Sequence, residues 1–216
     1  MTEINKPDSD QAAQGEMSAI MAGVLSRFIR DEIDGMLPAE VVSYDDATNR
    51  ATVKPLVMMG TTGGQKVSRA TLPNTPVWRF GGGGFFMRFP LKPGDKGWIV
   101  ANDRDISLVM QAKGGEDWPN TKRLHSFSDA VFFPDTFKDW VIAGGDTNNA
   151  VFQSVDGTNV IALADDAIEL RVGAQVLRLD ATGLYHNGIN IGDTHHHAGS
   201  PTAPLGPISN TGVPIP

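Results

Sequence analysis

The chain has 216 residues with 24 Gly, 14 Pro and no cysteine, which excludes disulfides, thiolate metal sites and a catalytic thiol. Its formal net charge of −7 argues against a duplex-binding surface, because phosphate contacts need clustered Lys and Arg. No apolar run is long enough to suggest a membrane-spanning helix, and we expect no Sec signal, because acidic residues precede the first apolar stretch.

Residues 1–36 are predicted to form an acidic arm followed by a helix. The first 16 residues are polar and acidic, which is typical of a mobile arm. Beyond them, apolar side chains recur at steps of three and four residues, which is helical spacing. They are Met17, Met21, Val24, Leu25, Phe28 and Ile33. The helix either packs on its own domain or docks onto a neighbouring subunit.

Residues 37–115 read as a small β domain. Two apolar segments, 40–44 and 50–57, flank a turn-rich stretch and predict a hairpin. Further strands are expected at 76–80, 85–89, 97–101 and 106–110, and a type II-like turn is expected at 92–97. This number of short strands predicts a closed barrel of the oligonucleotide/oligosaccharide-binding (OB) type.

Two features of this domain could have indicated ligand binding. The run of glycines at 81–84 lacks the Gly-Lys-Ser/Thr ending of a phosphate-binding P-loop, so we interpret it as a flexible loop. Trp78, Phe80 and Phe85 could stack nucleic-acid bases. Given the acidic balance of the chain, we expect these aromatic side chains to pack in the core instead.

Residues 116–149 are interpreted as a linker with a short helix over 126–134. Within it, His125, Ser126 and Asp129 have the residue types of a hydrolytic triad. Residues so close in sequence rarely converge in that geometry, and the chain has no nucleophile elbow. We therefore do not predict catalysis from these three residues.

Residues 150–197 form a series of short β-type units with turn residues between them. The strands are expected at 151–155, 159–164, 168–172, 175–180, 184–186 and 189–191. Each unit offers only two or three apolar side chains to an inner face, which is too few for a single-chain core. The sequence therefore predicts a shaft in which identical chains cover one another, and a threefold intertwined β-helix satisfies this requirement.

A run of three histidines follows the last of these strands. Strand side chains alternate with a period of two, so if Ile189 and Ile191 point inward, His195 and His197 share that face and His196 points outward. Three chains would then supply six imidazoles, an octahedral donor set suited to Fe²⁺, with Ni²⁺ or Co²⁺ as chemical substitutes. The alternative is that the run forms an exposed polar turn.

Three stretches resemble the central spike, or membrane-piercing needle, at the baseplate of contractile-tailed bacteriophages (the baseplate assembly protein V type). They are 187–199, a strand running into Thr-His-His-His and Gly, together with 92–97 and 123–131, which resemble the OB-domain signatures of the family. The resemblance implies a homotrimer of OB domains, an intertwined triple-stranded β-helix and a sharp apex, with residues 198–216 as a Pro/Gly-rich apex tail.

What the resemblance implies about function is structural. The protein would be a virion component at the tip of the tail baseplate, made in the host cytoplasm, which pierces the host outer membrane when the sheath contracts. One iron ion per trimer, held by His195 and His197 of each chain, would close the tip. The OB end would contact tail tube or hub proteins, and neither catalysis nor nucleic-acid binding is expected.

Two alternatives remain open at this stage. A tail-associated enzyme that degrades the cell envelope would need a pair of carboxylates in a cleft. The acidic residues at 165–166 and 31–34 are better interpreted as a turn and a solvated helix face. A carbohydrate-binding module on the barrel is the second alternative, although the sequence has no dedicated motif for it.

Overall fold

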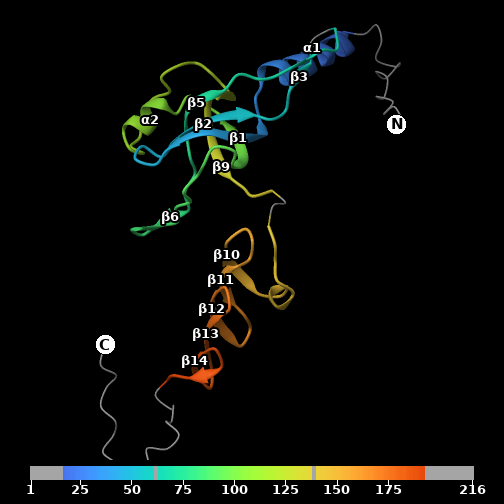
Figure 1. Ribbon diagram of the computed structural model, residues 1–216. Coiled ribbons are helices and arrows are strands. Elements are labelled where there is room, and N and C mark those ends of the chain that lie inside the picture. Colours follow the sequence, from blue (N-terminus) through green and yellow to red (C-terminus); the bar gives the residue numbers. More distant parts are fainter. Residues whose placement is uncertain (1–16, 61–62, 138–139, 193–216) are drawn as a thin grey trace, which may run out of the picture. The chain divides into compact units, whose positions relative to one another are not determined.

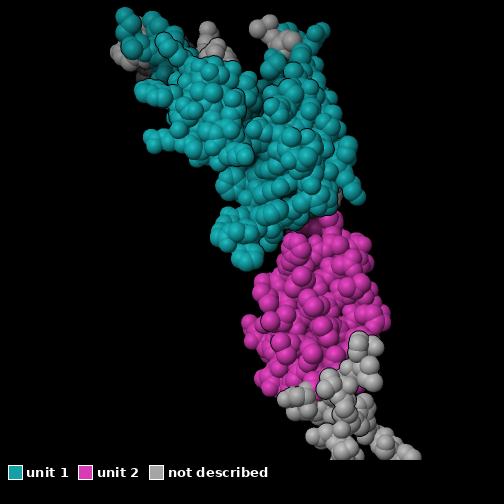
Figure 2. All heavy atoms as spheres, turned by 90° about the vertical axis from the view of Figure 1, so that its left-hand side faces the viewer, with its two compact units in different colours: residues 1–138 teal, residues 139–216 magenta. Residues whose placement is uncertain are grey.

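The computed structural model describes residues 17–60, 63–137 and 140–192 (Figure 1). It divides into two compact units, Met1–Lys138 and Asp139–Pro216, which are coloured separately in Figure 2. The described residues are mainly β, as the sequence predicts. Neither α-helix in them is long and apolar enough to cross a bilayer.

The described residues of the first unit form one long helix, one short helix and nine strands. They are α1 (Met17–Glu32), β1 (Met36–Asp45), β2 (Arg50–Pro55), β3 (Met59–Gly60), β4 (Lys66–Val67), β5 (Leu72–Pro76), β6 (Gly81–Gly82), β7 (Phe85–Phe86), β8 (Lys96–Asn102), α2 (Ser107–Gln111) and β9 (Ser126–Pro134). The second unit contains the 3₁₀ turn η2 (Gly144–Asp146), β10 (Ala150–Gln153), β11 (Asn159–Leu163), β12 (Ala167–Val172), β13 (Gln175–Asp180), β14 (Gly183–His186) and β15 (Ile189–Asn190).

The predicted N-terminal helix is confirmed as α1. Its large apolar side chains, among them Met17, Met21 and Phe28, are each at least half exposed. Asp34, just after the helix, is fixed to the barrel. Its backbone N–H donates to the carbonyl of His125 at 2.8 Å, and its carboxylate accepts from the N–H of Phe127 at 2.9 Å. The described part of the first unit therefore anchors the end of the helix but leaves its apolar side open.

A five-stranded sheet with the order β5-β2-β1-β8-β9 forms a nearly closed, barrel-like structure. All its ladders are antiparallel. The segment after β5 returns to β9 through a parallel bridge between Val77 and Phe132, and the N–H of Trp78 donates to the Phe132 carbonyl at 2.8 Å. This bridge joins the two edges of the sheet and accounts for the near closure.

The barrel interior is filled mainly by small and β-branched side chains, with two phenylalanine rings among them. The buried core consists of Ala39, Val41, Ala51, Val53, Val77, Ile99, Phe127, Ala130 and Phe132. Space is so limited that a Cβ on Gly97 would lie 2.2 Å from the carbonyl oxygen of Phe133 and 2.6 Å from the ring of Phe132. A narrow barrel of this kind has room for few aromatic side chains.

The expectation that Trp78, Phe80 and Phe85 pack in the core is wrong. All three are exposed, Phe85 to 84%. Trp78 stacks on Phe133 outside the barrel with ring centroids 5.1 Å apart. The interior is already filled, so these rings lie on its outer surface and on the projecting β6–β7 hairpin.

Two local predictions in this unit are also wrong. The helix expected over 126–134 is strand β9, whose side chains Phe127, Ala130 and Phe132 are buried while the strand pairs with β8. The strand expected at 106–110 is helix α2, where the Asp105 carboxylate accepts from the N–H of Ser107 at 2.9 Å. In both cases non-local pairing or a side-chain turn outweighs the local pattern. Much of the expected 116–149 linker thus belongs to the barrel unit.

The predicted turns are confirmed. β1 and β2 form the expected hairpin. The N–H of Asp95 donates to the carbonyl of Lys92 at 3.1 Å while Gly94 has φ of 95°, as a type II turn requires. The run of glycines, expected to be a loop, forms the β6–β7 hairpin, in which Gly83 and Gly84 both have positive φ and make its two-residue turn.

The second unit is a six-stranded antiparallel meander in which each strand pairs with the next, from β10 to β15. All six strands expected between 151 and 191 are confirmed within one or two residues at their ends. Turns with positive φ at Gly157, Gly173, Asn187 and Gly188 connect them. The meander brings every second residue of each strand onto one face, and this arrangement sets up the candidate site.

Candidate assembly face and metal centre

One face of the meander is apolar along its whole length. The register places Phe152, Ile161, Leu170 and Leu177 opposite one another in a continuous row across β10 to β13, and the row continues through His186 to Ile189. We call the face that carries this row the apolar face. Its apolar members on the strands are Phe152, Ile161, Leu163, Ile168, Leu170, Val172, Leu177, Leu179, Leu184 and Ile189.

The apolar face is open to solvent in the single chain. Most of its side chains are between 43% and 69% exposed, and only Leu177 and Leu184 fall below that range. Contiguous apolar patches of this kind are rare on monomeric proteins and mark contact surfaces. In the described residues of this unit, the buried apolar side chains are only Val160, Ala162 and Ala167, and all three belong to the opposite face.

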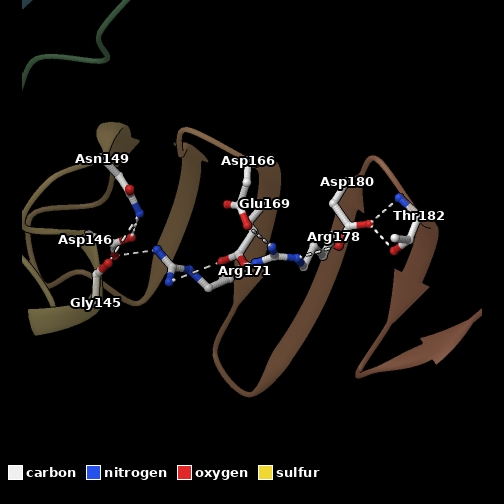
Figure 3. Close-up of polar contacts among 9 residues, drawn as sticks. All are labelled: Gly145, Asp146, Asn149, Asp166, Glu169, Arg171, Arg178, Asp180 and Thr182. Atoms are coloured by element: carbon white, nitrogen blue, oxygen red, sulfur yellow. Dashed lines mark hydrogen bonds and ion pairs between the residues drawn. The ribbon is translucent and has the colours of Figure 1, made fainter.

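The opposite face, here called the polar face, carries the charged side chains of the strands (Figure 3). Arg178 lies at its centre and donates to Glu169 at 2.8 Å, to Asp180 at 3.0 Å and to Asp166 at 3.1 Å. Arg171 pairs with Glu169 at 3.5 Å and with Asp146 of η2. The two guanidinium groups of the polar face are thus paired with four carboxylates, whereas the side chains of the apolar face are apolar and mostly half-exposed.

Hydrogen bonds favour the ionised form of two carboxylates that pair with the arginines of the polar face, those of Asp180 and Asp146. The Thr182 hydroxyl, and next the Arg178 guanidinium, lower the pKa of Asp180 to about 2. The same carboxylate, with Glu169, raises the pKa of Arg178 above its usual value. Arg171 lowers the pKa of Asp146, whose side chain is fully buried. These charges remain in place at neutral pH, so the polar face keeps its structure without a partner.

The predicted metal ligands His195 and His197 lie outside the described residues, as does His196. The chain can be followed to the point just before them. The N–H of Ile191 donates to the carbonyl of Leu184 at 2.8 Å, so the pairing with β14 continues one residue beyond β15. Ile189 and Ile191 are both exposed, consistent with positions on the apolar face. The predicted inward direction of both side chains therefore corresponds to the apolar face.

The residues considered for a hydrolytic triad have separate partners. His125 Nε2 lies 3.1 Å from Asp103, whereas Asp129 pairs with Arg123 at 3.0 Å. The Ser126 hydroxyl oxygen accepts from the backbone N–H of Ser128. The geometry therefore gives no support to a nucleophile, base and orienting acid in this segment.

The barrel carries a second exposed apolar feature at the β6–β7 hairpin, which bears Phe85 and Phe86. Its base is fixed by ion pairs: Asp46 accepts from Arg79 at 2.9 Å and from Arg88 at 2.8 Å. Elsewhere on the same unit, a cavity of about 240 Å³ is lined mainly by apolar side chains with one carboxylate and one guanidinium, those of Asp34 and Arg69. Sequence reasoning found neither the ion-pair network nor the cavity, because both depend on contacts between distant segments.

Comparison with known proteins connects the barrel to phages. The family model described as "Phage protein Gp138 N-terminal domain" matches residues 37–135, which is the barrel from the second residue of β1 to the residue after β9. A search of the curated proteins found no match to the chain. The family match indicates a phage protein, and the matched residues include β9.

Proposed function

We propose that the chain is a structural protein of a phage tail, a homotrimeric spike at the tip of the baseplate that pierces the host outer membrane during sheath contraction. The observation that carries this proposal is the uncovered apolar face of the meander, in a chain whose barrel matches a phage family. Three copies that turn this face toward a common axis would bury it and leave the three polar faces in solvent.

The two faces of the meander support this orientation. Burying the polar face in an interface would cost the desolvation of Arg178 and its three acidic partners, whereas burying the apolar face is favourable. Neighbouring strands lie about 4.8 Å apart, so the rows of the apolar face run along the direction in which the strands stack. Three such rows around an axis would make an intertwined shaft that resists force along its length.

The barrel would be the attachment end of the spike. Its five-stranded, nearly closed sheet is compatible with the OB fold, a small Greek-key barrel. We propose that it seats on tail tube or hub proteins. The exposed rings of the β6–β7 hairpin and the open side of α1 are the surfaces of this unit that such a partner could cover.

At the other end, His195 and His197 of three chains would hold one Fe²⁺. The donor set fits such an ion, because six neutral imidazole nitrogens suit an octahedral first-row cation. With all ligands supplied by protein, the ion would be structural and would fasten the three chains together where the shaft ends. The pairing of Ile191 with β14 supports the register from which these two histidines are assigned.

Two experiments test the proposal. Antibodies against the chain, located by electron microscopy on virions of the phage that encodes it, should label the tip of the baseplate. Labelling elsewhere on the particle would contradict the proposal. The purified protein should contain one iron per trimer, and H195A together with H197A should remove it while the barrel stays folded.

The enzyme alternative is separated by a different assay. We expect the purified trimer to leave peptidoglycan and outer-membrane polysaccharide intact, because the proposal assigns the chain a mechanical role. Release of soluble fragments from either polymer by the native protein, but not by a heat-denatured sample, would favour a tail-associated enzyme instead.

A further inference from the structure

One ionisable side chain lies on the apolar face of the described strands. His186 ends β14 and is paired in register with Leu177 on one side and Ile189 on the other. The other charged or titratable strand residues of the described meander lie on the polar face; they are Glu169, Arg171, Arg178, Asp180 and Tyr185. A histidine in an otherwise apolar row calls for a specific partner, because a buried polar group without one is costly.

The hydrogen bonds of His186 fix which ring nitrogen carries the proton. Asn187 accepts from the N–H of Val176 through its side-chain oxygen at 2.8 Å, so its amide nitrogen is the atom that faces Gln175. That nitrogen donates to the side-chain oxygen of Gln175 at 2.8 Å, and the same oxygen lies 3.0 Å from His186 Nε2. Since the Gln175 oxygen can only accept, Nε2 is the donor. The neutral ring therefore carries its lone pair on Nδ1.

This arrangement is the one that metal-binding histidines use. A ligating imidazole usually donates its other N–H to an oxygen, which fixes the tautomer and the ring orientation. In His186, Gln175 supplies that oxygen, and Asn187 fixes Gln175 in turn. The described structure therefore provides an oriented donor, Nδ1, on a face that the single chain leaves open.

The position of His186 in its row determines where three copies would meet. The row of His186 lies between two other rows of the apolar face. One of these contains Leu179 and Leu184, and the other contains Val172 and Gln175, so the row of His186 is the middle row. On a threefold axis, residues of the middle row lie closest to the axis. Each level of the shaft then contains three copies of one residue, and the His186 level lies between a Leu177 level and an Ile189 level.

We propose that three His186 side chains, one from each copy, form a second metal site on the shaft axis, distinct from the six-histidine apex. Three imidazole Nδ1 atoms are the donor set of a divalent transition ion such as Zn²⁺ or Co²⁺, with a water molecule or a small anion as fourth ligand. The apolar levels on either side would shield the ion from bulk solvent. The inference rests on the proposed trimer, because a single chain supplies only one of the ligands.

Co²⁺ is the probe that tests the site, since three nitrogens plus one small ligand favour a tetrahedral ion whereas six nitrogens give an octahedral one. The full-length chain is loaded with Co²⁺ and dialysed, and its molar mass, metal content and visible absorption are then measured together. We expect two ions per trimer in the wild type and one in H186L, with the intense tetrahedral absorption absent from H186L. The double variant H195A/H197A should keep that absorption and lose only the other ion.

Gln175→Leu provides a test that leaves the histidine in place. Loss of an orienting partner commonly weakens metal binding by about 10- to 100-fold, and we expect a loss of that size for Co²⁺ at the tetrahedral site. Asn159→Leu, also on the apolar face but three strands away, is the matched control and should leave the affinity unchanged.

The outcomes separate the two proposals. A wild-type trimer with the same metal content and spectrum as H186L overturns the second site and leaves the spike proposal standing. Unchanged affinity in Gln175→Leu overturns it as well, even if H186L fails to assemble. A monomeric wild-type protein overturns the spike proposal and, with it, the site.

Discussion

Leu170→Ala distinguishes an apolar face that is buried between copies from one that stays in solvent. Leu170 lies in the middle row of the apolar face, opposite Ile161 on β11 and Leu177 on β13. In the single chain its side chain is 43% exposed. The free-energy cost of removing it therefore depends on whether other copies cover the exposed part.

The expected magnitudes differ enough to be resolved. Fully burying a leucine contributes roughly 1.5–3 kcal/mol, so the truncation in an isolated, half-exposed chain should cost about 1 kcal/mol. In a packed interior, Leu→Ala costs about 2–5 kcal/mol, which for three copies amounts to roughly 6–15 kcal/mol per trimer. The account predicts the larger value, together with a midpoint of unfolding that rises with protein concentration.

Chemical denaturation at several protein concentrations measures this effect. Val176→Ala is the control, because Val176 is half-buried on the polar face, opposite Arg171. We expect the control to cost about 1 kcal/mol per chain at every concentration. Equal and concentration-independent costs for the two variants would refute the argument that the apolar face is an interface between copies.

Two further predictions concern acid stability and the barrel. Because the folded pKa of Asp180 is lowered to about 2, its contribution to stability is complete above about pH 4 and is lost as the pH falls from about 4 to 2. D180N should therefore flatten that part of an acid-unfolding curve followed by circular dichroism. An unchanged curve would contradict this role of Asp180. Gly97→Ala should destabilise the barrel by at least about 1–3 kcal/mol in thermal unfolding, because the added Cβ would overlap the Phe133 carbonyl. Gly82→Ala is the control and should be neutral, because the space around Gly82 is open. Equal melting temperatures for the two variants would contradict the prediction.

The parts of the fold that the sequence predicts are those that depend on local patterns. Alternation with a period of two identifies every strand of the meander, and Pro93 followed by Gly94 identifies the type II turn. The prediction that failed at β9 depends on contacts between segments that are distant in sequence. β9 begins with Ser126 and Ser128, which favour a helix start, yet its pairing with β8 closes the barrel. Local propensity carries no information about such a long-range partner.

In the candidate site, too, features that depend on local patterns are predicted and features that depend on distant contacts are not. The sequence predicts that the strands from 150 onward offer too few apolar side chains for a single-chain core, and only three apolar side chains are buried in the described residues of this unit. The ion pair between Asp146 and Arg171 was not predicted, because the two residues are far apart in sequence and only the meander brings them together. The ligand prediction for His195 and His197 stays a prediction, since both lie beyond the described residues.

The molar mass of the purified full-length chain in solution tests the central claim most directly. Three chains of 23.1 kDa give about 69 kDa, which the account predicts by light scattering at every concentration at which the protein is folded. Two meanders packed face to face could also cover their apolar faces, but as a dimer of about 46 kDa. A folded monomer or such a dimer would contradict the threefold shaft and the six-histidine apex that depends on it.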